Sequence, residues 1–174
     1  MQSAHKPPIV IHAGELVFGK GRRRIKTLLG SCVAITLWHP RHKYGGMCHF
    51  ALARKPATET AKGKTDARYA DDCMRLFRKL AEERGTRLSE YKANIYGGGN
   101  MLASARLAPD SEFVEVDRSP VGDSNAAQAF ALLVAEGVSI NEADVGEQGY
   151  RKVDFDPMTG QAKVEFVPIA NNKI

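Results

Sequence analysis

Short runs of alternating hydrophobic and polar residues make up much of the chain, and they predict more strands than helices. Glycine and proline bound most of these runs, which is typical of strands that end in tight turns. The predicted strands are residues 9–18, 25–29, 33–38, 46–52, 92–96, 138–140, 151–155 and 162–167. The Pro-Met-Thr-Gly sequence at 157–160 predicts a turn that joins the last two strands in a hairpin.

Two segments carry apolar residues at the helical period instead. One covers about 66–84, with Gly85 at the position of a C-terminal cap, and the other begins near 122–123 and ends at Gly137. Between strand and helix, the polar segment 54–64 predicts a loop, either a mobile flap or a plain surface loop.

The order of these elements indicates the fold class. Strands outnumber helices and do not alternate with them as parallel β-α-β units do, so we predict an α+β fold. The expected architecture is a single-domain sandwich of mostly antiparallel sheet with two covering helices. A chain of 174 residues suits one domain, which we place over 1–174, with a core from about 9 to 168.

Composition argues against membrane and secreted classes. The chain is 43% hydrophobic and 26% charged, and no stretch approaches the ~20 apolar residues of a membrane span. The N-terminus lacks the apolar segment of a signal peptide. We therefore expect a cytoplasmic protein that does not insert into a membrane, and nothing in the sequence calls for more than a monomer.

A basic run contributes to the formal net charge of +5. Its cations are Lys20, Arg22, Arg23, Arg24 and Lys26. Such a run can hold nucleic acid, an acidic membrane or an acidic protein, or it can be a solvated turn. No aromatic residue is interleaved with it as a base-stacking surface requires, so we do not expect nucleic-acid binding.

The three cysteines, Cys32, Cys48 and Cys73, form no CxxC pair and leave an odd thiol in any disulfide scheme. This favours a reducing compartment, and the spacing does not support a metal site. On the strand 46–52, Cys48 alternates with His49 and so points to the opposite face. Cys48 and Cys73, which lies on the apolar stripe of the first helix, are predicted core residues.

Cys32 and His49 are the strongest candidates for chemistry. Cys32 follows Gly-Ser in a small-residue turn, and His49 lies 17 residues later, so antiparallel pairing of 33–38 with 46–52 would bring them together. A thiol beside an imidazole is a nucleophile with its base. A cysteine after Gly-Ser is also a common core residue, and a lone strand histidine is usually structural, so both interpretations stay open here. The three glycines at 97–99 match no phosphate-binding motif and predict a tight loop beside a substrate or another loop.

Several blocks of the sequence resemble those of the CheD family of chemoreceptor glutamine deamidases. In order they are TLLGSCVAITLWHP, GGMCHFALA, RYADDCMRLF, KANIYGGGNM, VGDSN and ADVGEQGYRKVDFDPMTGQAKV. The resemblance extends from about Gly14 to Val167, and its first two blocks are specific.

The resemblance implies an enzyme, a protein-glutamine glutaminase that converts glutamine side chains of methyl-accepting chemotaxis receptors to glutamate. It also implies hydrolysis of receptor glutamyl methyl esters in some members, a CheC-type phosphatase as a partner, and no cofactor or metal. The implied fold is similar to the catalytic domain of the cytotoxic necrotising factors. An alternative is a weakly active or inactive adaptor that binds receptors or the phosphatase.

Carried over onto this chain, the resemblance makes Cys32 the nucleophile and His49 its histidine. The third family residue is a threonine shortly before the cysteine. In some relatives it stands six positions earlier, where this chain has Lys26, so Thr27 at five positions earlier is the nearest candidate. A one-residue offset moves a strand side chain to the other face of the sheet, and Thr27 is therefore a provisional assignment.

Overall fold

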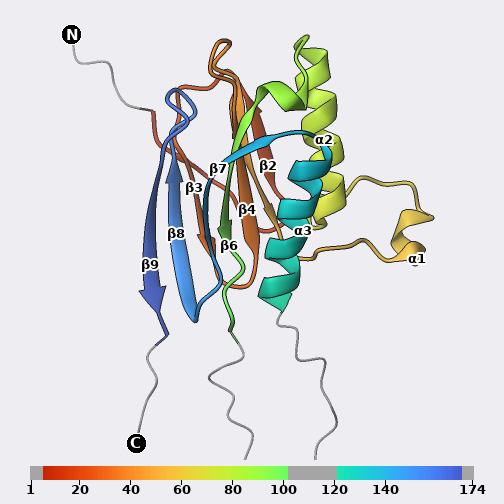
Figure 1. Cartoon of the computed structure of the whole chain (residues 1–174), viewed down its shortest axis with the longest axis vertical. Helices are drawn as coiled ribbons and strands as arrows, with labels where there is room; N and C mark the ends of the chain where they lie inside the picture. Colours follow the sequence, from red (N-terminus) through yellow and green to blue (C-terminus); the bar gives the residue numbers. More distant parts are fainter. Residues whose placement is uncertain (1–5, 102–120, 170–174) are drawn as a thin grey trace, which may run out of the picture.

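Two β-sheets lie face to face, and two helices cover the outer face of one of them, so the protein has three layers (Figure 1). The structure, a computed structural model, describes residues 6–101 and 121–169. The four-stranded sheet has the order β1-β3-β8-β9, and the five-stranded sheet has the order β2-β5-β4-β6-β7. The strands are β1 (Ile9–Val10), β2 (Leu16–Gly19), β3 (Ile25–Leu29), β4 (Val33–Trp38), β5 (Gly45–Phe50), β6 (Lys92–Gly97), β7 (Ser139–Val145), β8 (Gly149–Phe155) and β9 (Ala162–Pro168). The helices are α1 (Ala57–Thr60), α2 (Ala70–Glu83), α3 (Val121–Ala135) and the 3-10 turn η1 (Leu88–Glu90).

The predicted fold class is confirmed. The pairs β1·β3 and β6·β7 are parallel, and the other neighbouring strands pair antiparallel, including the predicted hairpin of β8 and β9. The two long helices, α2 and α3, cover the five-stranded sheet as predicted.

The single strand predicted over 9–18 is wrong, because this segment contributes to both sheets. β1 pairs with β3 in one sheet, and β2 pairs with β5 in the other. Gly14 lies between them with a φ of +88°, a left-handed conformation that favours glycine, and there the chain crosses from one sheet to the other.

The strand predicted over 138–140 continues to Val145. β7 is an edge strand of the described five-stranded sheet, and most of its side chains are partly or fully exposed. Residues 141–144 therefore lack the alternation by which a half-buried strand is recognised.

The inter-sheet layer, between the two sheets, is apolar at its centre. Strand alternation directs Ile25 and Leu29 of β3 inward, and Ala34 of β4 and Met47 of β5 meet them from the other sheet. Because β4 and β5 are covered on both faces, their residues are almost all buried. This layer determines how closely side chains of the two sheets approach.

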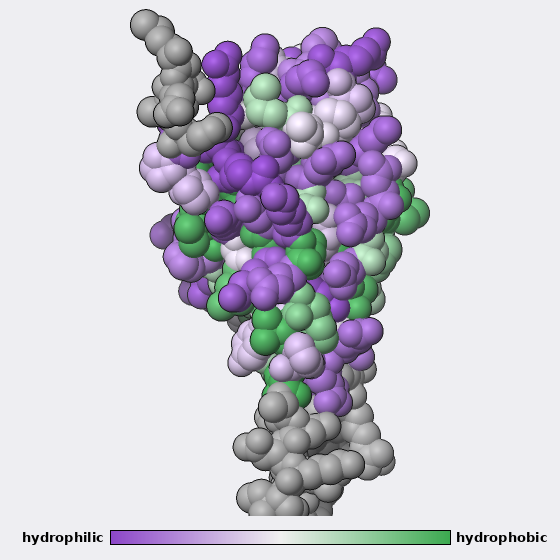
Figure 2. Space-filling view, turned by 90° about the vertical axis from the view of Figure 1, so that its left-hand side faces the viewer, coloured by the Kyte–Doolittle hydropathy of each residue, from purple (hydrophilic) through white to green (hydrophobic). Residues whose placement is uncertain are grey.

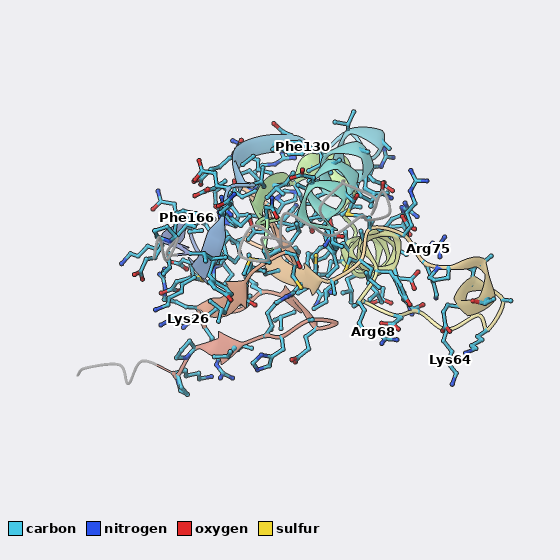
Figure 3. All side chains as sticks on the ribbon, turned by 90° about the horizontal axis from the view of Figure 1, so that it is seen from below. Lys26, Lys64, Arg68, Arg75, Phe130 and Phe166 are labelled. Carbon is cyan, nitrogen blue, oxygen red and sulfur yellow. The ribbon has the colours of Figure 1, made fainter. Side chains whose placement is uncertain are left out.

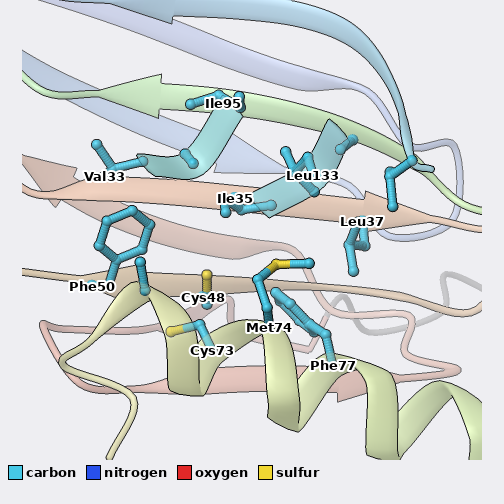
Figure 4. Close-up of a cluster of buried hydrophobic side chains, with 14 of the residues drawn as sticks. Val33, Ile35, Leu37, Cys48, Phe50, Cys73, Met74, Phe77, Ile95 and Leu133 are labelled. Carbon is cyan, nitrogen blue, oxygen red and sulfur yellow. The ribbon is translucent and has the colours of Figure 1, made fainter. Parts of the chain in front are cut away.

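The second core lies between the five-stranded sheet and the helices (Figure 4). Cys48 of β5 and Cys73 of α2 are both fully buried in it, which confirms them as core residues. The Cys73 thiol donates to the carbonyl oxygen of Ala67 at 3.1 Å. The neighbouring Cys48 and burial raise the pKa of Cys73, so it stays a neutral thiol.

The outer face of the four-stranded sheet carries mixed charged and apolar side chains (Figure 2). Lys26, Asp154 and Lys163 stand in register across β3, β8 and β9, and Lys26 and Asp154 form an ion pair at 3.8 Å. Lys26 thus points to solvent, whereas its neighbour Thr27 is 5% exposed and points into the inter-sheet layer.

The triple glycine loop, 97–99, lies directly against the turn that carries Cys32. The Gly98 N–H donates to the Cys32 carbonyl oxygen and the Gly99 N–H to that of Gly30, both at 2.9 Å. Of the two predicted settings for this loop, the structure shows contact with another loop. Gly97 has a φ of +109°, and a Cβ there would overlap the Cys32 carbonyl oxygen.

We expect Gly97→Ala to lower the free energy of unfolding by about 2–5 kcal/mol. Alanine is strained at this positive φ, and its Cβ would overlap the Cys32 carbonyl oxygen. Urea denaturation measures this change. Gly21→Ala is the control, because no atom of residues 6–101 or 121–169 lies within 4 Å of a Cβ placed at Gly21, and its effect should stay within about 0.5 kcal/mol. Equal effects of the two substitutions would contradict the packing argument.

Candidate active site

Cys32 lies in the turn 30–32, which leads from β3 in one sheet to β4 in the other. Each carbonyl oxygen of this turn accepts a hydrogen bond: those of Gly30 and Cys32 from the triple glycine loop, and that of Ser31 from the Asn125 side chain at 3.0 Å. The turn is therefore held from two sides. The Cys32 side chain is partly buried and packs against the apolar residues of the inter-sheet layer.

His49 lies on β5, beside this turn. β4 and β5 pair antiparallel as predicted, with Ala34 directly opposite His49. Cys32 precedes Ala34 by two residues and so occupies the diagonal position on the same face, where side chains stand roughly 7 Å apart at their bases. The register therefore places Cys32 and His49 on the same side of β4 and β5, toward the inter-sheet layer, where Cys32 packs against apolar residues and His49 contacts Thr27.

Thr27 of β3 reaches His49 from the opposite sheet. Its Oγ1 lies 2.7 Å from His49 Nδ1 and 2.7 Å from the carbonyl oxygen of Ile11. A carbonyl can only accept, so the hydroxyl donates to Ile11, and Nδ1–H donates to the hydroxyl oxygen. This arrangement places the ring proton on Nδ1 and leaves Nε2 with a free lone pair, as a base requires.

Burial keeps both reacting groups neutral. Desolvation, with a smaller repulsion from His12, lowers the pKa of His49 from 6.5 to about 4. Burial likewise raises the pKa of the Cys32 thiol. Among the described residues, His49 Nε2 is buried and has no hydrogen-bond partner. The resting pair is thus a thiol and a neutral imidazole rather than an ion pair.

The basic run lies at the far end of the sandwich. Four of its cations lie in the connection from β2 to β3, at a distance from the Cys32 turn on the order of 20 Å, the length of β3, and the fifth, Lys26, lies within β3. Arg24 pairs with Asp154 at 2.6 Å, so part of its charge is neutralised.

The segment 54–64, predicted as a mobile flap or a plain surface loop, contains the short helix α1, which was not predicted, and an ion pair fixes one end of it. Lys55 forms an ion pair of 2.8 Å with Asp72, which is 1% exposed. Viewed from the Cys32 end, Lys64 of the flap lies with Arg68 and Arg75 on one side of the sandwich, away from Lys26 and Phe166 (Figure 3).

Two buried polar residues near the site were not recognised from the sequence. Asn125 of α3 donates to Ser31 and to Ala51, and Arg151 of β8 donates to the carbonyl oxygens of Gly97 and Gly146 and pairs with Asp144 at 3.0 Å. Asn125 is the last residue of the VGDSN block, but nothing in that block indicates that its side chain contacts the Cys32 turn. Arg151 belongs to a strand whose alternation places it inside, which was a usable signal.

The described residues contain neither a metal-binding cluster nor a membrane-spanning helix. No group of three or more His, Cys, Asp and Glu side chains there is arranged to hold a metal ion. No helix in the described part of the chain is both long and apolar enough to cross a membrane.

Comparison with known proteins places the chain in a family. A sequence model described as CheD chemotactic sensory transduction matches residues 51–166. The chain belongs to the CheD family. The CheD match begins after Thr27, Cys32 and His49, so the roles of these three residues rest on their geometry and on the resemblance noted above.

CheD relatives align along nearly the whole chain. A protein of Dechloromonas aromatica, named probable chemoreceptor glutamine deamidase CheD 3, is 36% identical over 95% of this chain and 91% of its own length. A probable chemoreceptor glutamine deamidase CheD of Pseudomonas savastanoi is 38% identical over 92% of this chain and 85% of its own length. A CheD 1 protein of Leptospira interrogans, named in the same way, is 30% identical over 90% and 91%.

The lowered pKa of His49 predicts a loss of stability in acid. Unfolded chains bind a proton at this imidazole below about pH 6.5, and the folded protein does so only below about pH 4. Stability therefore falls as the pH drops between these values, by about 3 kcal/mol in all. His49→Asn removes the titrating imidazole, while the asparagine amide can still form a hydrogen bond with Thr27. The stability advantage of the wild type over this variant should shrink by that amount between pH 7 and pH 4 in urea titrations. A constant difference would contradict the buried, neutral imidazole.

Proposed function

We propose that this protein deamidates glutamine side chains of methyl-accepting chemotaxis receptors through Cys32, with His49 as base and Thr27 as its orienting partner. The observation that carries the proposal is the Thr27–His49 hydrogen bond, which occupies Nδ1 and leaves Nε2 available as a base in a member of the CheD family. The names of the relatives supply the substrate class.

Attack begins with transfer of the Cys32 proton to His49 Nε2. The thiolate sulfur then bonds to the carboxamide carbon, and the electron pair of the C=O bond moves to oxygen. His49 returns its proton to the amide nitrogen as the C–N bond breaks, so ammonia leaves and a thioester remains. The neutral resting pair suits this sequence, because each group changes charge only while substrate excludes water.

Hydrolysis of the thioester repeats the same steps with water. His49 takes a proton from water as the oxygen attacks the thioester carbon. The C–S bond then breaks and His49 returns the proton to the sulfur, which gives glutamate and the Cys32 thiol. A glutamyl methyl ester would follow this route with methanol as the leaving group. Neither reaction needs a cofactor or a metal.

Backbone N–H groups of the Cys32 turn are our candidates for stabilising the oxyanion. The carbonyl oxygens of Gly30, Ser31 and Cys32 are all held by protein donors, which restrains the orientation of the peptide planes. In the proposed reaction the N–H groups of Ser31 and Cys32 would donate to the oxyanion from this restrained turn.

The Cys32 end of the sandwich would receive the receptor. The cytoplasmic part of the receptor is the expected substrate, and the reaction is therefore placed in the cytoplasm. The basic run, at the far end, is separated from this docking region. A CheC-type phosphatase remains a proposed partner, and an adaptor role without turnover is the alternative.

The decisive experiment is mass spectrometry of a receptor cytoplasmic fragment incubated with the protein. We expect a mass gain of about 1 Da at defined glutamines with the wild type and none with Cys32→Ala, because the nucleophile is lost. Cys48→Ala is the control, since Cys48 lies in the other core, and it should keep the activity when folded. Absence of conversion with several receptors would favour the adaptor, and a pull-down with the phosphatase would then be the next test.

Thr27→Val should lower kcat at least tenfold with little change in KM, because the valine keeps the shape but leaves Nδ1–H unpaired and the ring free to turn. Thr27→Ser keeps the hydroxyl and should retain most of the activity. Steady-state deamidation kinetics on the same fragment measure both variants. Equal activity of Thr27→Val and the wild type would remove Thr27 from the mechanism.

A further inference from the structure

We propose that Asn125 of α3 is a positioning residue that locks the Cys32 turn to the end of the strand carrying His49. This inference rests on the proposed function, and nothing assigned so far gives Asn125 a role. Its side-chain nitrogen donates to the carbonyl oxygen of Ser31 at 3.0 Å and to that of Ala51 at 2.9 Å.

The two acceptors flank the reacting groups. Ser31 directly precedes Cys32, and Ala51 follows His49 by two residues. In the register of β4 and β5, Ala51 is the residue that faces Cys32 when the ladder is extended by one position beyond Val33 and Phe50. Both carbonyls therefore lie where the two strands separate, just beyond their last paired residues.

Chemistry fixes which end of the amide lies between these oxygens. A carbonyl oxygen only accepts, and the Asn125 amide nitrogen has two hydrogens, one for each acceptor. The side chain is fully buried, and its Oδ1 has no partner among the described residues. Burying Oδ1 without a partner costs free energy. The two hydrogen bonds of the Asn125 nitrogen offset this cost, and they join the backbone just beyond the paired ends of β4 and β5.

The rest of α3 is held firmly enough to serve as a fixed support. A Cβ at Gly122, in its first turn, would overlap the carbonyl oxygens of Gly98 and Gly99, so the helix backbone packs directly on the triple glycine loop. One turn after Asn125, Gln128 donates to Asp71 of α2 at 2.9 Å. Through Asn125, the firmly packed helix α3 holds the backbone of the Cys32 turn in place.

The test is Asn125→Asp, which keeps the shape but places a carboxylate against two carbonyl oxygens. We expect kcat to fall roughly tenfold or more with KM nearly unchanged, because the thiol and imidazole lose their mutual alignment. Alkylation of Cys32 by iodoacetamide, followed by peptide mass spectrometry, should slow at pH 8 relative to the wild type. The ratio of the alkylation rate of Asn125→Asp to that of the wild type should rise toward one as the pH falls to 5.5, since a protonated carboxyl can donate to one of the carbonyls.

Gln128→Glu is the matched control, with the same amide-to-acid change on the same helix and a lost contact to α2. Asn125→Leu, which is uncharged and of similar volume, provides a second variant should Asn125→Asp fail to fold, and it should show the same loss without recovery in acid. The proposal is overturned if the Asn125 variants alkylate as Gln128→Glu does at both pH values. Because alkylation needs no receptor, it distinguishes failure of this proposal from failure of the deamidase assignment, which wild-type turnover tests separately.

Discussion

The hydrogen bond between Thr27 and His49 spans the gap between the two sheets, and the candidate site depends on it. Stacked sheets lie about 10 Å apart, a spacing set by the side chains between them. Here those side chains form a fully apolar cluster around Ala34 and Met47, with both polar partners buried at its end. Close packing of the inter-sheet layer is therefore what holds a 2.7 Å contact between side chains on different sheets.

Backbone carbonyl oxygens organise the other half of the site. The Cys32 turn is held by the triple glycine loop and by Asn125, and Arg151 in turn holds the carbonyls of Gly97 and Gly146. A buried carbonyl left without a donor is costly, so these contacts oppose movement of the turn. Cys32, the proposed nucleophile, thus lies in a turn whose backbone is held by residues outside the proposed chemistry.

Local pattern predicted much of this arrangement. Alternation identified β3 and β4 to the residue and placed His49 and Cys48 on opposite faces, and the short connection predicted the pairing of β4 with β5. The sequence left the choice between Lys26 and Thr27 provisional, and in the structure β3 buries Thr27 and exposes Lys26. What the pattern could not reveal was long-range. The division of 9–18 between two sheets depends on partners far along the chain, and the role of Asn125 depends on where α3 packs.

The pairing of β3 with β8 has a consequence for how the protein is made. Thr27 sits opposite Val153, and Arg24 binds Asp154 across a sequence separation of 130 residues. During translation β8 is synthesised long after β3, and until then β1, a strand of two residues, is the one sheet neighbour of β3 in the described part of the chain that has already been made. Contacts between such distant segments form slowly. We therefore expect the contact between Thr27 and His49 to form at a late step of folding, and in a chain that lacks β8 the His49 ring would not be held by Thr27.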